Sequence, residues 1–296
     1  MSNLGRLLGA TISVPDLAGA VAAYERSLGF VLRGEGVIPD ALAHAYAAPA
    51  AAGSRYAIVG AASDTDVVLR LVGGPQPPSF APLRVSGWSS LVLPVQAVDE
   101  LAKSLVDTAF AALDRVRETT IAGVNGRVLH VRGPGNEVLS FIETKPGGPL
   151  PTPRARIDSV FAASIACPEL DRATEFYENK LLLDVAPVTP MTLWAVNDAF
   201  GFDGPTRHEV RLISLPGSTM IELQQFPESV VRRPAVPRHL PPGIALVSFA
   251  ATSTLDDVPV YSLTGQQRID EAPYGGRTQM TFYGAANEMI ELIEGA

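Results

Sequence analysis

The chain has 296 residues, of which 47% are hydrophobic and 18% are charged, a length and composition typical of two globular domains with ample core. Its 31 acidic residues exceed its 23 basic residues, and the formal charge of −8 argues against nucleic-acid binding, because phosphate recognition needs clustered lysine and arginine. No apolar run approaches the ~20 residues that span a bilayer, and the single cysteine, Cys167, excludes an internal disulfide framework, so we expect a cytoplasmic protein with no membrane partner.

Proline-rich segments divide the chain into four parts, here called modules one to four. They lie at residues 73–86, 145–156 and 227–243. Proline lacks a backbone N–H and cannot continue a helix or a central strand, so these segments are predicted to be linkers. Each module begins with an apolar run that is predicted to be a strand, and the four runs are Leu8–Val14, Ser89–Val95, Val160–Cys167 and Ile244–Ala250.

A helix is predicted after the first strand of each module, most clearly in modules one and three. There Pro15-Asp16 and Pro168-Glu169 place a proline and an acidic residue in the first turn, where both favour a helix. In module four, Pro259 limits the helix. Three β-like runs complete each module, and in module four they are Gln267–Glu271, Thr278–Tyr283 and Glu288–Ile293.

The two halves of the chain repeat each other. The sequence Val14-Pro15-Asp16-Leu17, followed by Tyr24, returns as Cys167-Pro168-Glu169-Leu170, followed by Tyr177. A second pair closes the halves, at Asn136–Glu143 and Asn287–Glu294. An internal repeat of this regularity predicts that equivalent segments have the same structure. Cys167, which takes the place of the apolar Val14, is therefore assigned to the core.

Four βαβββ modules in tandem resemble the vicinal oxygen chelate superfamily, which includes glyoxalase I, bleomycin-resistance proteins and extradiol dioxygenases. The resemblance covers the whole chain and is carried by Val14–Phe30, Glu175–Leu181 and Asn287–Glu294. It implies an α+β fold in which four βαβββ modules form two half-open mixed β-barrels with helices outside. The barrels are expected at residues 1–145 and 155–296, joined by a proline-rich linker at 146–154.

The resemblance also indicates where a metal would bind. In the family, an inward-facing histidine on the first strand of a module and a glutamate on its last strand are ligands. The first-strand positions here are Gly9, about Ser90, Ala162 and about Gly243, and the last-strand positions are Arg70, Ser140, Glu222 and Glu291. None of the first-strand residues is an ordinary ligand, so we expect a degenerate site with no metal and no cofactor. Only the C-terminal half keeps two carboxylates, and we expect the N-terminal barrel to be structural, or to bind an anion or nothing.

Glu222 and Glu291 alternate with apolar neighbours and point away from them, and the resemblance implies that both face one apolar cavity of the C-terminal barrel. Two carboxyls in such a cavity would raise the pKa of one of them and create an acid/base group. His208 or Tyr283 would assist. The alternatives are that both carboxylates face solvent, or that together they hold a weak cation such as Mg²⁺.

An aromatic insertion before residue 208 could line a ligand pocket. The candidate ligand contacts are Trp194, Phe200, Phe202, His239 and Phe282. Ordinary packing of the aromatic side chains, and a surface position for His208 and His239, are the alternatives. His130 lies in the middle of a predicted strand and is expected in the half-buried core.

These patterns favour a metal-independent enzyme of the lyase, isomerase or dehydratase type. It would move a proton on a small, largely apolar or aromatic oxygenated molecule. One alternative is a non-catalytic protein that binds or sequesters a small molecule, as bleomycin-resistance proteins do. A second alternative is an extradiol-type metallo-dioxygenase whose ligands lie in another register. The expected partner is a small molecule, and a homodimer is left open.

Overall fold

The computed structural model describes residues 2–145 and 147–296; Pro146, the first residue of the predicted linker, lies outside the described residues. Module one contains β1 (Leu4–Val14), α1 (Leu17–Ala23), β2 (Val31–Val37), α2 (Asp40–Ala45), β3 (Arg55–Gly60) and β4 (Val68–Gly73). Module two contains β5 (Gly87–Pro94), α3 (Val98–Ser104), β6 (Ala111–Ala112), β7 (Arg117–Ile121), β8 (Val124–Arg132) and β9 (Val138–Thr144).

Module three contains β10 (Ala162–Cys167), α4 (Leu170–Asn179), β11 (Thr189–Thr192), α5 (Trp194–Phe200), β12 (Arg207–Leu215) and β13 (Thr219–Gln225). Module four contains β14 (Gly243–Ala251), β15 (Gln267–Ile269), β16 (Arg277–Tyr283) and β17 (Met289–Ile293). Its helix is reduced to the 3₁₀ turn Leu255–Asp257, as Pro259 predicts, whereas α1 is extended by the π-helical turn Tyr24–Leu28.

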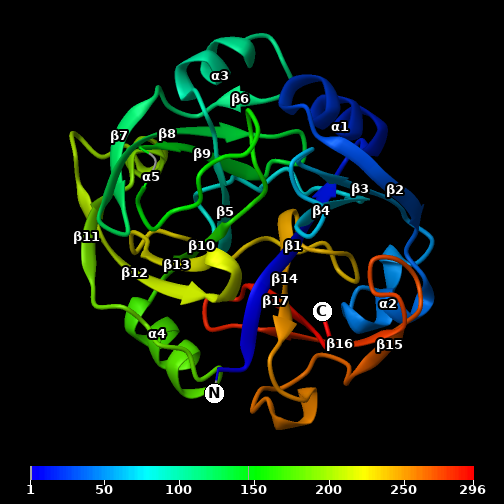
Figure 1. Ribbon diagram of the computed structural model, residues 1–296. Helices are drawn as coiled ribbons and strands as arrows, with labels where there is room; N and C mark the ends of the chain where they lie inside the picture. Colours follow the sequence, from blue (N-terminus) through cyan, green and yellow to red (C-terminus); the bar gives the residue numbers. More distant parts are fainter. Residues whose placement is uncertain (1, 146) are drawn as a thin grey trace.

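The strands form two curved mixed sheets, and the predicted α+β fold with two half-open barrels is confirmed (Figure 1). The eight-stranded sheet has the order β15-β16-β17-β14-β1-β4-β3-β2, and the nine-stranded sheet has the order β11-β12-β13-β10-β5-β9-β8-β6, with β7 also paired to β8. Helices α1, α3 and α4 lie outside the barrels. Their buried side chains, including Tyr24, Leu101 and Tyr177, join one large apolar cluster with residues of both sheets.

The pairing of modules differs from the expected pairing. β1 runs antiparallel to β14, from Leu4 opposite Ala251 to Ser13 opposite Gly243, and β5 runs antiparallel to β10. One barrel, the outer-module barrel, therefore consists of residues 4–73 and 243–293, and the other, the inner-module barrel, of residues 87–144 and 162–225. Figure 1 shows the blue β1 beside the orange β14.

The prediction that residues 1–145 and 155–296 each form a barrel of their own is therefore wrong. In each module, the first strand lies at the edge of that module's part of the sheet. The backbone N–H and C=O groups along this edge need hydrogen-bond partners. The first strand of any other module can supply this partner. The sequence of a module predicts its own strands but contains no signal for the module with which it pairs.

Two short helices occupy equivalent places inside the curves of the sheets. Leu42 and Tyr46, from α2 and the residue after it, belong to an apolar cluster with Leu246, Met289 and other residues of the outer-module barrel. In the inner-module barrel, Ala195 and Val196 of α5 line the cavity described below. Both helices lie within the insertions between the first helix and the last strands of their modules.

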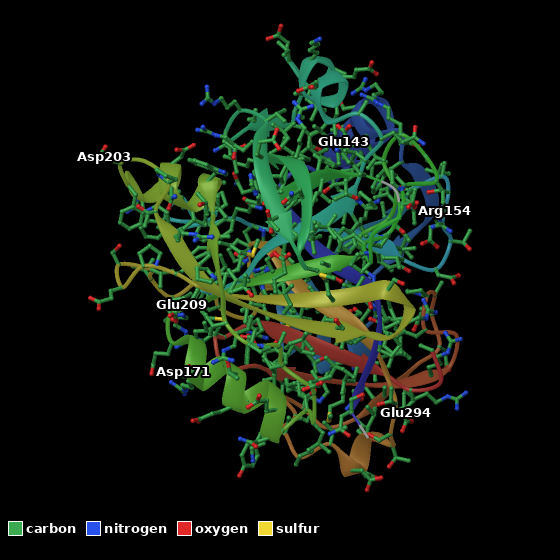
Figure 2. All side chains as sticks on the ribbon, turned by 60° about the vertical axis from the view of Figure 1, so that its left-hand side comes forward. Glu143, Arg154, Asp171, Asp203, Glu209 and Glu294 are labelled. Carbon is green, nitrogen blue, oxygen red and sulfur yellow. The ribbon has the colours of Figure 1, made fainter. Side chains whose placement is uncertain are left out.

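The outside of the molecule carries most of its charge. Figure 2 shows Asp171, Asp203 and Glu209 projecting from the surface, and all three are exposed. Glu143 and Glu294, at the ends of the repeated strands, have a structural use: Glu143 Oε2 accepts a hydrogen bond from the backbone N of Val98 at 2.9 Å, and Glu294 Oε1 from that of Leu255 at 3.1 Å. Among the described residues, every helix is too short or too polar to cross a bilayer.

Candidate functional site in the inner-module barrel

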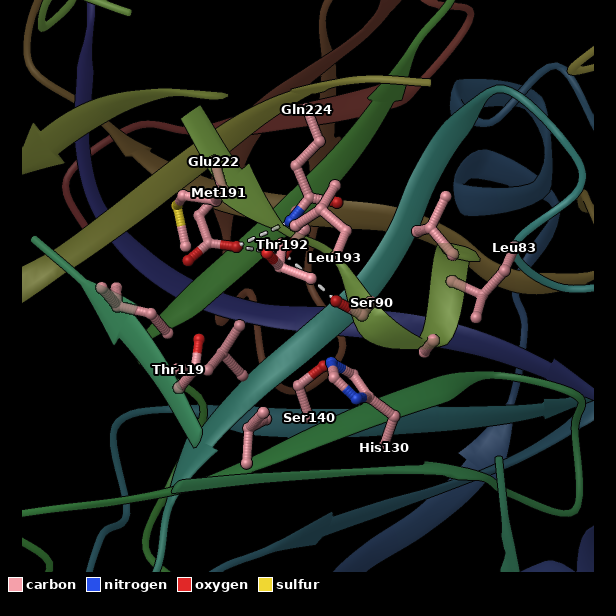
Figure 3. A pocket seen from close by; sticks show the side chains of 16 residues that line it. Leu83, Ser90, Thr119, His130, Ser140, Met191, Thr192, Leu193, Glu222 and Gln224 are labelled. Carbon is pink, nitrogen blue, oxygen red and sulfur yellow. Dashed lines mark hydrogen bonds between the residues drawn. The ribbon is translucent and has the colours of Figure 1, made fainter. Parts of the chain in front are cut away.

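The concave side of the inner-module barrel encloses a cavity of about 50 Å³ (Figure 3). Successive residues of a strand point to opposite faces, so alternate residues line it. Ser90, Ser140, Ser164 and Glu222 come from β5, β9, β10 and β13. This volume holds a few water molecules or the end of a ligand, and not a whole ligand of ordinary size.

Glu222 is the ionisable group at the centre of this cavity. Its side chain is 4% exposed, and its Oε2 accepts hydrogen bonds from Ser164 Oγ at 2.7 Å and from Gln224 Nε2 at 3.1 Å. Its Oε1 is buried and has no hydrogen-bond partner among the described residues. Burial raises the pKa of the carboxyl, and the hydrogen bonds from Ser164 and Gln224 offset this only in part. The environment therefore favours the protonated acid.

A row of hydroxyl groups leads to this carboxyl. Ser90 Oγ donates to Ser164 Oγ at 3.1 Å, and Ser164 Oγ donates to Glu222. Ser164 lies opposite Ser90 on the antiparallel strand and beside Glu222 on the parallel strand. The first-strand position beside Glu222 is therefore Ser164 and not Ala162 as predicted, since Ala162, two residues earlier on the same face of the strand, lies beside Met220.

His130 is a second titratable group that lines the cavity. Asp114, whose side chain is fully buried, accepts from the backbone N of His130 at 3.1 Å and lies 2.9 Å from His130 Nδ1. An ionised Asp114 makes Nδ1 the protonated nitrogen and leaves Nε2 as a proton acceptor. His130 is half-buried as predicted, with its side chain 19% exposed, and the hairpin turn at residues 133–136, which pairs it with Ser140, is the sequence signal that could have indicated its place in the cavity.

An open groove of about 830 Å³ lies outside the cavity, between β7 and β11. Thr119, Met191 and Thr192 line both the groove and the inner cavity, so they form the passage between the two. Trp194 borders the groove; its indole N–H donates to the Glu118 carbonyl at 3.2 Å, and the guanidinium of Arg117 lies 4.5 Å from its ring centre. A ligand could bind in the groove with one end beside Glu222.

No protein-family model and no curated protein sequence matches the chain. Several solved structures match the chain. A point mutant of glyoxalase I from Zea mays has a TM-score of 0.64 at 14% identity, covering 98% of this chain and 92% of that chain. Glyoxalase I from Zea mays in another crystal structure has a TM-score of 0.63 at 13% identity, with coverage of 98% and 92%. A candidate dioxygenase from Bacillus subtilis has a TM-score of 0.58 at 13% identity, with coverage of 99% and 86%.

The chain has the vicinal oxygen chelate fold. A fold hosts many activities, so what a vicinal oxygen chelate protein does has to be argued from its site. The metal that this fold implies would need several histidine or carboxylate ligands on the inner faces of the sheets. Among the described residues, no three His, Cys, Asp or Glu side chains lie close enough together to hold an ion. The groups hydrogen-bonded to Glu222 are a hydroxyl and an amide, and His130 adds one imidazole to the lining, so this cavity does not offer the several histidine and carboxylate ligands that a transition metal needs.

Glu291 lies in the other barrel of the vicinal oxygen chelate fold. It is on β17, which pairs with β14 and β16, whereas Glu222 is on β13, which pairs with β10 and β12. The prediction that Glu222 and Glu291 face one cavity is wrong because modules three and four belong to different barrels. For the same reason, the two carboxylates cannot hold one cation between them.

His208 and Tyr283, which were predicted to assist Glu222 in proton transfer, lie outside its cavity. His208 is 8% exposed at the start of β12, where its Nε2 lies 2.7 Å from Asn197 Oδ1 of α5, and burial lowers its pKa. This contact holds α5, and His208 is not among the residues that line the inner cavity. Tyr283 is 44% exposed at the end of β16, in the other sheet, and partial burial raises its pKa.

Of the predicted ligand contacts, Trp194 borders the groove. The Phe200 and Phe202 rings lie 6.3 Å apart on the far side of α5, and Phe200 also packs against Phe226. Phe282 is fully buried and packs against Phe176 of α4 on the convex side of the outer-module barrel. His239 is partly buried in the linker at 227–243 and lines neither cavity.

Proposed function

We propose that the protein is a lyase or isomerase that uses the inner-module barrel to move a proton on a small, largely apolar or aromatic oxygenated molecule, without a metal. The observation that carries the proposal is the uncommitted, buried Oε1 of Glu222. A carboxyl that burial keeps protonated can donate to a ligand oxygen where charge develops during the reaction. General acids of this kind contribute about 10²–10⁴ to the rate.

Glu222 and His130 together support a step in which one proton is given to the ligand and another is taken from it. The ligand binds in the groove beside Trp194, and its oxygenated end passes Met191 to reach Glu222. Glu222 gives its proton to the ligand carbonyl oxygen while His130 Nε2 takes a proton from the adjacent carbon, which forms an enol. Asp114 stabilises the imidazolium that results. Return of a proton to a different carbon gives an isomer, and loss of a leaving group from the enol gives the lyase reaction.

The test is hydrogen–deuterium exchange on the carbon next to a carbonyl, which requires only the first half of the reaction. A panel of small ketones and aldehydes is incubated with the protein in D₂O and followed by ¹H NMR. We expect exchange with at least one compound, a loss of about 10²–10⁴ in rate for Glu222→Gln, and an unchanged rate for the matched variant Glu291→Gln in the other barrel. Equal rates for the wild type and Glu222→Gln would remove Glu222 from the mechanism.

The second candidate is a protein that binds its ligand without turnover. The size of the two spaces favours it, because the groove is about 830 Å³ and the cavity beside Glu222 only about 50 Å³. Most of a ligand would then lie outside the reach of the carboxyl. Trp194 fluorescence separates the candidates, since Trp88, the other tryptophan of the chain, is buried. A compound that quenches Trp194 but undergoes no exchange supports sequestration.

A further inference from the structure

The outer-module barrel contains a second cavity, of about 270 Å³, which is separate from the site of Glu222. Three arginines line it, Arg6, Arg70 and Arg277, against the two carboxylates of Asp66 and Glu291. The lining is thus of mixed charge, and the whole chain has a formal charge of −8, so an anion would need a positioned cationic side chain to bind here.

Arg70 is the buried cation of this cavity, and it is held in place on one side only. Its side chain is 5% exposed, and its Nη1 donates to Tyr46 Oη at 2.5 Å and to Tyr274 Oη at 2.9 Å. The guanidinium carbon lies 5.0 Å from the centre of the Tyr274 ring. Its Nε, in contrast, has no hydrogen-bond partner among the described residues. An arginine fixed in this way has already lost the side-chain entropy that binding an anion would otherwise cost.

The nearest carboxylate, Glu291, is occupied by other groups. Tyr274 Oη donates to its Oε1 at 2.7 Å, and Ser248 Oγ donates to its Oε2. The Tyr274 hydroxyl thus stands between Arg70 and Glu291, and Tyr46 Oη lies 2.6 Å from it. Glu291 balances the charge of Arg70 through this relay, while the edge of the guanidinium that carries Nε is left for another acceptor.

The rest of the lining combines small and polar residues, among them Thr11 and Ser248, with a group of apolar side chains. Leu8, Val68, Pro273 and Ile293 form the walls, and the exposed residues Thr65, Asp66 and Arg277 mark the mouth. A ligand that fits both parts has a compact anionic head and a short apolar body. Carboxylates match the planar donor edge of arginine better than spherical anions do.

We infer that the outer-module barrel binds a small organic carboxylate, with its carboxylate on Arg70 and its apolar body against Leu8, Val68 and Ile293. This site is independent of proton transfer at Glu222. It also explains why Arg70 occupies the position at which the resemblance implies a metal-binding glutamate. A negative side chain there would bind a metal ion, whereas the positive Arg70 would bind an anionic ligand.

The test is calorimetric titration of the intact protein with benzoate and with benzamide, its uncharged analogue. We expect one saturable benzoate site per chain and binding of benzamide at least about tenfold weaker, because hydrogen bonds to a charged acceptor are the stronger ones. Arg70→Met should abolish benzoate binding. Glu222→Gln, in the other barrel, should bind benzoate as the wild type does.

A second variant guards against misfolding of Arg70→Met, which circular dichroism would reveal. Val68→Phe keeps Arg70 and its partners but fills the cavity, and it should also lose benzoate. The inference is overturned if the wild type does not bind benzoate saturably, if benzamide binds equally well, or if a folded Arg70→Met or Val68→Phe protein keeps the affinity of the wild type.

Discussion

Tyr177 donates a hydrogen bond to Glu288, Oη to Oε1 at 2.8 Å, across the boundary between the two barrels. Tyr24 makes the equivalent contact with Glu137 at 2.6 Å. The second oxygen of Glu288 accepts from the backbone N of Ala286, and that of Glu137 from the backbone N of Gly135. Burial raises the pKa of both carboxyls to about 7. The repeated tyrosine and Asn-Glu motifs of the sequence are therefore two halves of one contact that joins the barrels.

These two carboxyls predict a decrease in stability with increasing pH. Their pKa is about 7 in the folded protein against a model value of 4.5, so the folded state holds protons that the unfolded chain releases first. Their contribution to the free energy of unfolding is complete below about pH 4.5 and is lost as the pH rises to about 7. Urea unfolding across this range measures it.

Glu288→Gln isolates the contribution, because glutamine resembles the protonated acid. We expect a flatter dependence of unfolding free energy on pH in the variant, and higher stability than the wild type above about pH 7. His208, whose lowered pKa acts in the opposite direction near the model value of 6.5, is present in both proteins and cancels in the difference. A variant with the same pH dependence as the wild type would contradict the raised pKa.

Ser164→Ala tests Glu222 as an acid. The hydroxyl of Ser164 donates to Glu222 and lowers the pKa of the carboxyl, so its removal should raise that pKa further. The exchange rate, which needs the protonated acid, should then persist to higher pH in the variant. Ser248→Ala, which removes the equivalent hydrogen bond to Glu291, is the matched control and should leave the pH profile of the rate unchanged.

His208→Ala tests whether His208 acts in chemistry or only positions α5. The variant leaves Asn197 Oδ1 without its partner at 2.7 Å, and an unsatisfied buried polar group costs about 1–3 kcal/mol. We expect a stability loss of this order and a lower exchange rate whose pH profile keeps its shape. Disappearance of one limb of the profile would instead identify His208 as the base in place of His130.

The purified protein should contain no stoichiometric iron, zinc or manganese. Glu222 is hydrogen-bonded to a serine hydroxyl and an amide, with His130 as a single imidazole in the lining, and Glu291 lies in a cavity with Arg70, whose positive charge repels a metal ion. Elemental analysis of protein prepared without chelators checks this expectation. About one tightly held transition metal per chain would favour the dioxygenase alternative.

The elements and some of the inward residues could be predicted from the sequence, because they depend on local patterns. Proline positions predicted the modules, and the alternation around Glu222, together with the resemblance to the family, predicted that it faces inward. Three features depend on contacts that no local pattern encodes: the pairing of β1 with β14, the register that sets Ser164 beside Glu222, and the placement of α5 inside a barrel. Because the pairing of the modules was predicted wrongly, Glu291 was assigned to the cavity of Glu222. The two carboxyls lie in different barrels, so the predicted rise in pKa from their shared cavity does not apply.

Because each half of the chain contributes one module to each barrel, neither half contains a complete cavity. Two copies of a half could build both cavities only by exchanging modules, as in a dimer held by β1–β14-type and β5–β10-type contacts. The present chain is equivalent to such a dimer with its two subunits covalently tethered. Tethering makes assembly independent of protein concentration. It also frees the two cavities from symmetry, so that one could acquire Arg70 while the other kept the short serine side chains around Glu222.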